Sequence, residues 1–129
     1  MFAADVASQS LGIELAAAAD GQAVVRMRVT RLMVNGHGIA HGGYLFLLAD
    51  TAFACACNSY GPTTVAAGAE ITFIASARLG DLLVATATER ASYGRNGIYD
   101  VTVHREDAAG SDVIAEFRGH SRTIERTGK

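Results

Sequence analysis

The chain has 129 residues, half of them hydrophobic, and 11 basic against 13 acidic residues give a formal net charge of −2. This length predicts one domain, residues 1–129, with a true hydrophobic core. The charge balance argues against nucleic-acid binding and membrane-surface attachment, because both need clustered positive charge.

The first third of the chain predicts a short helix, a turn, a strand and a glycine-rich loop. The helix is expected over Ala3–Ser10 and the turn at Asp20-Gly21. Between Ala23 and Thr30 apolar residues alternate with others, the period of a strand with one buried face. The loop Asn35–Gly43 follows, with four glycines and two histidines.

The only long helix is expected over Tyr44–Asn58, before the stop signal Gly61-Pro62. It is apolar on nearly every side, as is typical of a helix wrapped by protein. It is too short for a membrane span, which needs about 20 apolar residues, and we expect no signal peptide before it. Cys55 and Cys57 would point about 200° apart on this helix. We therefore expect two buried free thiols and a cytoplasmic protein.

Four strand-like runs with turn residues between them fill the rest of the chain. Short connections between consecutive strands favour antiparallel pairing, so the pattern predicts an α+β domain whose curved sheet of five to six strands wraps the central helix. The runs are Thr64–Ile74, Asp81–Ser92, Gly97–Glu106 and Asp112–Ile124, and the turns are Gly80-Asp81, Gly94–Gly97 and Ala109–Ser111.

Asp50 is unusual because it is a charged residue in an otherwise apolar helix. A carboxylate inside an apolar helix is costly to bury unless it is paired or solvated. One interpretation is a structural Asp that hydrogen bonds satisfy, or one that faces a cleft. The other is a general base or nucleophile whose reactivity is set by a nonpolar cleft.

His41-Gly42-Gly43 stands where the helix begins. Free N–H groups and the positive end of the helix dipole point outward there, and could polarise a carbonyl oxygen or bind a phosphate. The alternative is an ordinary helix entry beside an exposed histidine. Gly42 and Asp50 are eight residues apart, about 12 Å along the axis. If both act on one carbonyl carbon, they come from two subunits and the site lies at a dimer interface.

The sequence lacks the motifs of a metal site, a serine nucleophile and a phosphate-binding loop. His37, His104 and His120 show no ligand spacing with one another or with the cysteines, so no metal site is expected. Neither Gly-x-Ser-x-Gly nor a phosphate loop is present. The later arginines are interpreted as scattered surface charges, although some could meet a nucleotide phosphate. They are Arg78, Arg95, Arg118, Arg122 and Arg126.

The segment from Asn35 to Asn58 resembles that of hotdog-fold acyl-CoA thioesterases, above all the phenylacetyl-CoA (phenylacetic acid degradation) thioesterase family. Gly94–Asp100 and Phe117–Ser121 also resemble this family, and the similarity runs from about Leu11 to Ile124. The resemblance implies a hotdog fold with two protomers joined through their sheets, and dimers paired into a homotetramer.

The resemblance also implies the roles of the site residues. The N–H of Gly42 would polarise the thioester carbonyl, and Asp50 of the neighbouring subunit would attack it or activate water. Asn35 and His41 would line the site. CoA would lie along the strand after the helix, with its phosphates near Arg95 and Asn96. Gly43 would also contact the substrate, and the small side chains around Ala66, Ala67 and Gly68 would leave room for a flat acyl ring. No metal or redox cofactor would be needed, since CoA is part of the substrate.

The expected reaction is hydrolysis of a short-chain or aromatic acyl-CoA, with phenylacetyl-CoA or hydroxyphenylacetyl-CoA first. Two features depart from the family. Phe73-Ile74-Ala75-Ser76 replaces a basic residue followed by proline, and Ala54 stands where some relatives carry a hydroxyl. The alternatives are a non-catalytic acyl-CoA-sensing module and an acyl-thioester hydratase or dehydratase.

Overall fold

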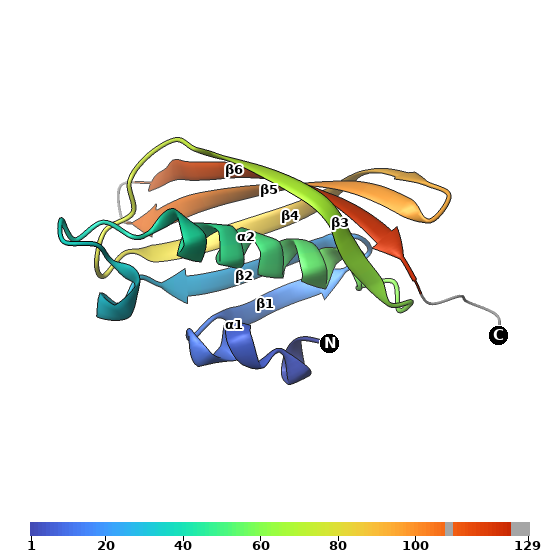
Figure 1. Ribbon diagram of the computed structural model, residues 1–129, viewed down its shortest axis with the longest axis horizontal. Helices are drawn as coiled ribbons and strands as arrows, with labels where there is room; N and C mark the ends of the chain where they lie inside the picture. Colours follow the sequence, from blue (N-terminus) through green and yellow to red (C-terminus); the bar gives the residue numbers. More distant parts are fainter. Residues whose placement is uncertain (108–109, 125–129) are drawn as a thin grey trace.

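The computed structural model describes residues 1–107 and 110–124. One six-stranded antiparallel sheet, in the order β1-β2-β4-β5-β6-β3, curls around the helix α2 (Figure 1). The predicted hotdog architecture is therefore confirmed, with six strands. The elements in chain order are η1 Phe2–Ala4, α1 Val6–Ser10, β1 Glu14–Ala19, β2 Gln22–Arg28, η2 Arg31–Met33, α2 Gly42–Cys57, β3 Thr64–Phe73, β4 Leu82–Tyr93, β5 Asn96–Asp107 and β6 Gly110–Thr123.

The N-terminal part differs from the prediction in two ways: strand β1 was not predicted, and the single predicted helix is two separate short helices. β1 pairs with β2 through a two-residue turn at Asp20-Gly21, where both residues have positive φ (53° and 79°). Such a turn matches the twist of the two strands it joins. The expected helix Ala3–Ser10 is two pieces, η1 and α1, separated at Asp5. The side chain of Asp5 caps α1 by accepting a hydrogen bond from Ser8 N–H.

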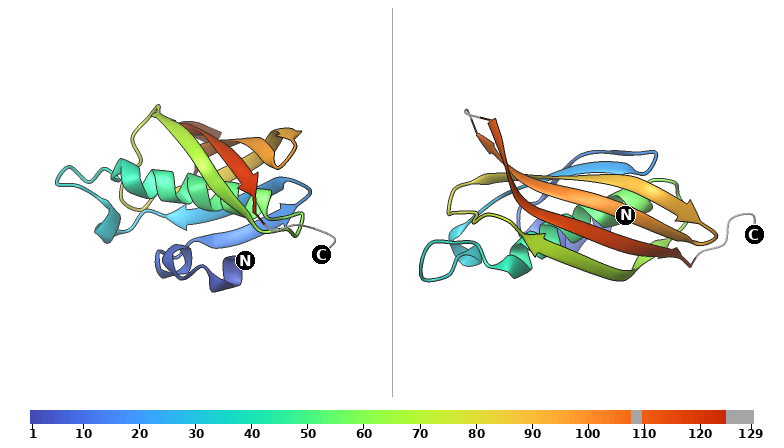
Figure 2. Two further views of the ribbon diagram at one scale, coloured as in Figure 1. Left: turned by 45° about the vertical axis from the view of Figure 1, so that its right-hand side comes forward. Right: turned by 90° about the horizontal axis from the view of Figure 1, so that it is seen from above.

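Strand β3 pairs with β6 and not with its successor β4. The register runs from Thr64 opposite Thr123 to Phe73 opposite Ala115. The chain therefore crosses the sheet after β3, whereas β4, β5 and β6 follow one another as antiparallel neighbours. β1 and β3 form the two edges of the sheet (Figure 2). The expected turn Ala109–Ser111 and the surface charge of Arg126 fall wholly or partly outside the described residues.

The core lies between α2 and the concave face of the sheet. Leu48, Ala49 and Ala52 are completely buried, and Phe53 is 1% exposed. The Phe53 ring lies with its centroid 5.8 Å from that of Phe117. A Cβ on Gly119 of β6 would come within 2.8 Å of the Phe53 ring. Glycine at that position therefore lets the helix side chain pack directly on the strand backbone.

The C-terminal end of α2 is joined to β3 through Asn58. Its side-chain amide donates to Ala54 O (2.9 Å) and Thr64 O (3.0 Å), and its carbonyl oxygen accepts from Thr64 N–H (3.0 Å). This pairing fixes the start of β3 relative to the helix. No helix in residues 1–107 or 110–124 is long and apolar enough to cross a membrane.

Candidate active site

The glycine-rich loop before α2 is a small hairpin organised by Asn35. Asn35 Oδ1 accepts from the N–H groups of His37 (2.8 Å) and Ile39 (3.2 Å), and Asn35 N–H donates to Ile39 O (2.9 Å). Val34 and Ala40 form a bridge across the base of the loop. Asn35 therefore shapes the approach to α2 through its side-chain oxygen.

Helix α2 begins at Gly42, two residues earlier than the sequence predicts, with His41 as its N-cap. The exposed His41 side chain makes no capping hydrogen bond, although His41 N–H donates to Met33 O (2.8 Å). In the described part of the chain, the N–H groups of Gly42 and Gly43 donate to no protein acceptor. The helix dipole adds positive potential at these two donors, so they could hold an oxyanion.

The ring of Phe73 lies directly against Gly42. A Cβ on Gly42 would be 2.7 Å from Phe73 Cζ, whereas a Cβ on Gly43 would meet no atom within 4 Å. Phe73 itself is 51% exposed. The end of β3 thus closes one side of the helix N-terminus and leaves the Gly43 side open.

Asp50 lies on the least covered side of α2, together with Gly43, Leu47 and Ala54. These residues are three or four positions apart, the spacing of one helix face. Asp50 is half-buried, and no described residue donates a hydrogen bond to its carboxylate. Burial, followed by repulsion from Asp5, raises the pKa of Asp50 above its ordinary 3.8. Such a carboxylate is a stronger base than a solvated one.

The N-terminal helix α1 is attached to α2 beside Asp50. Thr51 Oγ1 lies 2.7 Å from Ser8 Oγ and 2.8 Å from Leu47 O, and its single hydroxyl hydrogen can be donated to either oxygen. Both Ser8 and Thr51 are buried. The sequence did not predict this contact. The spacing of Asp5 and Ser8 could have indicated a helix cap, but not that the cap lies next to Asp50.

The other predicted substrate-binding residues lie in two other places. Ala67 and Gly68 are exposed at the edge strand β3, where the register shifts between Ala66 and Gly68. Arg95 lies in the β4–β5 turn after Gly94, whose φ is 60°, and Asn96 is the first residue of β5. They border a hollow of about 100 Å³ that also contacts Tyr60 and Tyr99.

Within one chain these predicted residues do not converge. The β4–β5 turn lies at the opposite end of α2 from Gly42 (Figure 1). Asp50 stands between the two ends, about 12 Å along the axis from Gly42. Asn35, His41, Gly42 and Gly43 cluster at one end of the helix. A site that uses all of these residues needs a second subunit.

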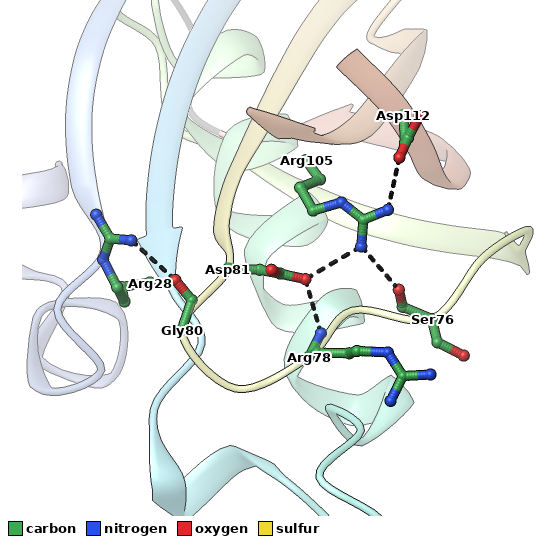
Figure 3. Close-up of polar contacts among 7 residues, drawn as sticks. All are labelled: Arg28, Ser76, Arg78, Gly80, Asp81, Arg105 and Asp112. Carbon is green, nitrogen blue, oxygen red and sulfur yellow. Dashed lines mark hydrogen bonds and ion pairs between the residues drawn. The ribbon is translucent and has the colours of Figure 1, made fainter. Parts of the chain in front are cut away.

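The crossover loop between β3 and β4 is held by Arg105 of β5 (Figure 3). Its guanidinium donates to Ser76 O (3.3 Å), Asp81 Oδ2 (3.2 Å) and Asp112 Oδ2 (2.6 Å). Asp81 Oδ2 also accepts from Arg78 N–H (2.8 Å), and the loop supports the hairpin before α2, because Ala40 N–H donates to Ala77 O (2.8 Å). Arg105 thus indirectly supports the helix N-terminus.

The thiols are ordinary core groups. Cys55 and Cys57 are both buried and free, as predicted. Burial raises the pKa of Cys55 to about 11 and that of Cys57 to about 12. Both therefore stay protonated near neutral pH and are poor nucleophiles. No group of three His, Cys, Asp or Glu side chains in the described residues could hold a metal ion.

Comparison with known proteins identifies relatives with this architecture. The pattern of the thioesterase superfamily matches residues 37–110. The acyl-coenzyme A thioesterase PaaI of Escherichia coli is 43% identical over 124 residues, which cover 96% of this chain and 86% of that protein. A putative esterase of Deinococcus radiodurans is 36% identical over 87% of this chain and 75% of its own length.

Solved structures agree with these sequence matches. The E. coli PaaI protein from the phenylacetic acid degradation operon superposes with a TM-score of 0.91 at 43% identity, covering 96% of this chain and 88% of that one. A mutant of the phenylacetic acid degradation protein PaaI from Thermus thermophilus has a TM-score of 0.84 at 33% identity, covering 91% of this chain and 97% of that one. The chain belongs to the thioesterase superfamily.

Proposed function

We propose that this protein is an acyl-CoA thioesterase that hydrolyses short-chain or aromatic acyl-CoA to the free acid and CoA. Phenylacetyl-CoA and hydroxyphenylacetyl-CoA are the first substrates to test. The observation that carries the proposal is the 43% identity, over 96% of the chain, with a protein named acyl-coenzyme A thioesterase PaaI. The free N–H groups at the start of α2 and the half-buried Asp50 supply suitable chemistry.

The reaction starts with the thioester carbonyl at the N-terminus of α2. The N–H of Gly42 donates to the carbonyl oxygen and stabilises the negative charge that develops on it. Asp50 then either takes a proton from an attacking water or attacks the carbonyl carbon itself to form an anhydride that water hydrolyses. In both routes the C–S bond breaks, and the sulfur leaves as the CoA thiolate, which takes up a proton.

The two groups act together across a dimer interface. Because Gly42 and Asp50 of one chain are too far apart to share a carbonyl, Asp50 of the partner subunit completes the site. Edge strand β3 is the natural surface for this pairing, since six consecutive residues from Val65 to Glu70 are exposed. Pairing two β3 strands would satisfy the free backbone groups of both edges. Two such dimers form a homotetramer.

The remaining site residues bind and orient the substrate. Asn35 and His41 line the entrance beside Gly42. Gly43, Ala67 and Gly68 leave room for the acyl group, because a Cβ on Gly43 or Gly68 would meet no atom within 4 Å. Arg95 and Asn96 contact the CoA phosphates. The enzyme works without a metal or redox cofactor in the cytoplasm, where it recovers CoA from blocked intermediates of aromatic catabolism.

Thiol release from a panel of acyl-CoAs tests the proposal. Rapid release from phenylacetyl-type substrates is expected. Asp50→Asn should lower it by several orders of magnitude while CoA binding persists. Full activity in Asp50→Asn would move the chemistry to another residue. Tight CoA binding without turnover of any acyl-CoA would contradict hydrolysis and identify a sensing module.

A further inference from the structure

The segment before β1 is fastened to α2 by a buried polar contact. Ser8 is 2% and Thr51 5% exposed, and their hydroxyl oxygens lie 2.7 Å apart. Buried hydroxyls are usually hydrogen-bonded. Because the Ser8 hydroxyl hydrogen is donated to Asp5, Thr51 is the donor in this contact, which is the side-chain hydrogen bond between α1 and α2 in the described chain. α1 has only five residues, so its position depends on such tertiary contacts.

The carboxylate of Asp5 is oriented by the same serine. Ser8 N–H donates to Oδ1 (3.0 Å) and Ser8 Oγ donates to Oδ2 (2.6 Å). Ser8 thus holds both carboxylate oxygens of Asp5. Ser8 also contacts Thr51, which is next to Asp50 in the sequence. No described Lys, Arg or His forms an ion pair with Asp5 or Asp50. Two acidic side chains from different elements therefore lie in the same part of the molecule, and no described Lys, Arg or His side chain pairs with either of them.

We propose that Asp5 is a positioning residue of the active site: the Ser8–Thr51 contact holds its carboxylate near the turn of α2 that carries Asp50, so that the two carboxylates act as a pair. This inference rests on the proposed role of Asp50 in thioester hydrolysis. Asp5 touches no reacting atom and acts only through Asp50.

The charge of Asp5 has a defined effect on Asp50. Two like charges near each other favour protonation of one of them. Repulsion from Asp5 accordingly raises the pKa of Asp50, in addition to the larger effect of burial. Of the other titratable groups nearby, the charge of Asp50 raises the pKa of Cys57, and the N-terminal amine opposes the rise in the pKa of Cys55. No charged group of the sheet in the described residues affects the pKa of Asp50. Asp50 is thereby a stronger base at neutral pH.

The test uses Asp5→Asn, which removes the charge and keeps an equally good helix cap. Glu14→Gln is the matched control, because it removes one exposed N-terminal negative charge that has no effect on the pKa of Asp50. Two quantities are measured in the full-length protein. One is the titration of the Asp50 carboxyl carbon by NMR, assigned with Asp50→Asn. The other is the acid limb of kcat/KM for thiol release against pH.

We expect the Asp50 titration to move to lower pH in Asp5→Asn and to stay in place in Glu14→Gln. The acid limb of kcat/KM should move with it. An unchanged Asp50 titration in Asp5→Asn would overturn the inference. If the NMR titration moves and the acid limb does not, the pairing of the carboxylates is supported and the proposed catalytic role of Asp50 fails, so the two ideas are separable.

Thr51→Val tests whether the hydroxyl contact does the positioning. Valine has a similar shape but cannot bond to Ser8, whereas the cap formed by Asp5 remains. In the Thr51→Val background, Asp5→Asn should shift the Asp50 titration less than in the native background. An equal shift in both backgrounds would overturn the positioning role of this contact. Asp5→Ser, which also keeps a good cap, repeats the measurement if Asp5→Asn folds poorly.

Discussion

Phe73 lies so close to Gly42 that a Cβ on the glycine would come within 2.7 Å of the ring. The last residue of β3 and the first residue of α2, 31 positions apart in the sequence, therefore share one contact at the helix N-terminus. The proposed oxyanion donor is thus bordered by an aromatic ring from the sheet. The close ring, and not the backbone conformation, favours glycine at position 42, since the φ of Gly42 is not positive.

Gly42→Ala should disturb the site more than the stability. The added methyl group has to displace the half-exposed Phe73 ring, a shift that costs about 1 kcal/mol, the lower end of the range for overpacking, because the ring can move into solvent. Thiol release should fall roughly tenfold to a hundredfold, since a displacement of about 1 Å at a reacting group has that effect. Steady-state kinetics with phenylacetyl-CoA and thermal unfolding measure the two quantities.

Two further variants identify the cause of this loss. Gly43→Ala adds the same methyl group where no atom lies within 4 Å, so its melting temperature should not fall. Phe73→Ala removes the ring, and Gly42→Ala should then cost less activity than in the native protein. Additive effects of Gly42→Ala and Phe73→Ala would contradict the direct contact.

Asp50→Asn should stabilise the folded protein at neutral pH. The pKa of Asp50 is raised in the folded state above the ordinary 3.8, so ionised Asp50 destabilises the fold at every pH above its folded pKa. This destabilisation disappears as the pH falls below both pKa values. The melting temperature of Asp50→Asn should therefore exceed that of the native protein at pH 7, and the difference should shrink in acid. An equal difference at all pH values would argue against the raised pKa.

The Arg105 network should stabilise the crossover loop measurably. Arg105 is 23% exposed and bonds to two carboxylates and a backbone oxygen. Charge networks of this kind exceed the contribution of isolated surface pairs, about 0–1 kcal/mol, so Arg105→Ala should cost about 1–2 kcal/mol in unfolding free energy, less at high salt. Arg31→Ala, at an exposed residue, is the control and should lie within about 0.5 kcal/mol of the native protein. Equal urea midpoints for both variants would contradict the role of the network.

A charge on edge strand β3 should separate the subunits. Ala69 is exposed near the middle of β3, and two aspartates facing each other across paired strands repel. Ala69→Asp should therefore give smaller particles in sedimentation velocity, with little thiol release and a native circular dichroism spectrum. Ala17→Asp places the same charge on the opposite edge strand, β1, and should leave the assembly intact. Dissociation by Ala17→Asp alone would move the interface to β1.

The sequence was informative where a structural feature depends on neighbouring residues. The helix was predictable because its apolar run ends before Gly61-Pro62, and the hairpin of β4 and β5 because Gly94 permits a tight turn. β1 was missed because Glu14–Ala19 contains four alanines, is exposed throughout and so shows no alternation. The pairing of β3 with β6 was also missed, since no local signal encodes a contact between Thr64 and Thr123.

The residues of the candidate site also divide into those that the sequence could predict and those that it could not. His41-Gly42-Gly43 and Asp50 could be singled out because their motif is contiguous on one helix and its entry. Phe73 and Asp5 could not, because each reaches the site from a distant element through the tertiary fold. An exposed aromatic ring at a strand end and an N-terminal helix cap are common features that carry no functional signal until their neighbours are known.

The insertion of β6 between β5 and β3 has a consequence for biosynthesis. During translation β3 is synthesised before its partner β6. Thr64, for example, cannot pair until Thr123 has been made. Until then α2 lacks the cover of the strand that carries Phe117 and Gly119, and its apolar surface is open to unwanted association. Pairings so distant in sequence also slow folding. A nascent chain that lacks β6 therefore exposes the apolar surface of α2, and association of such chains should lower the yield of native protein.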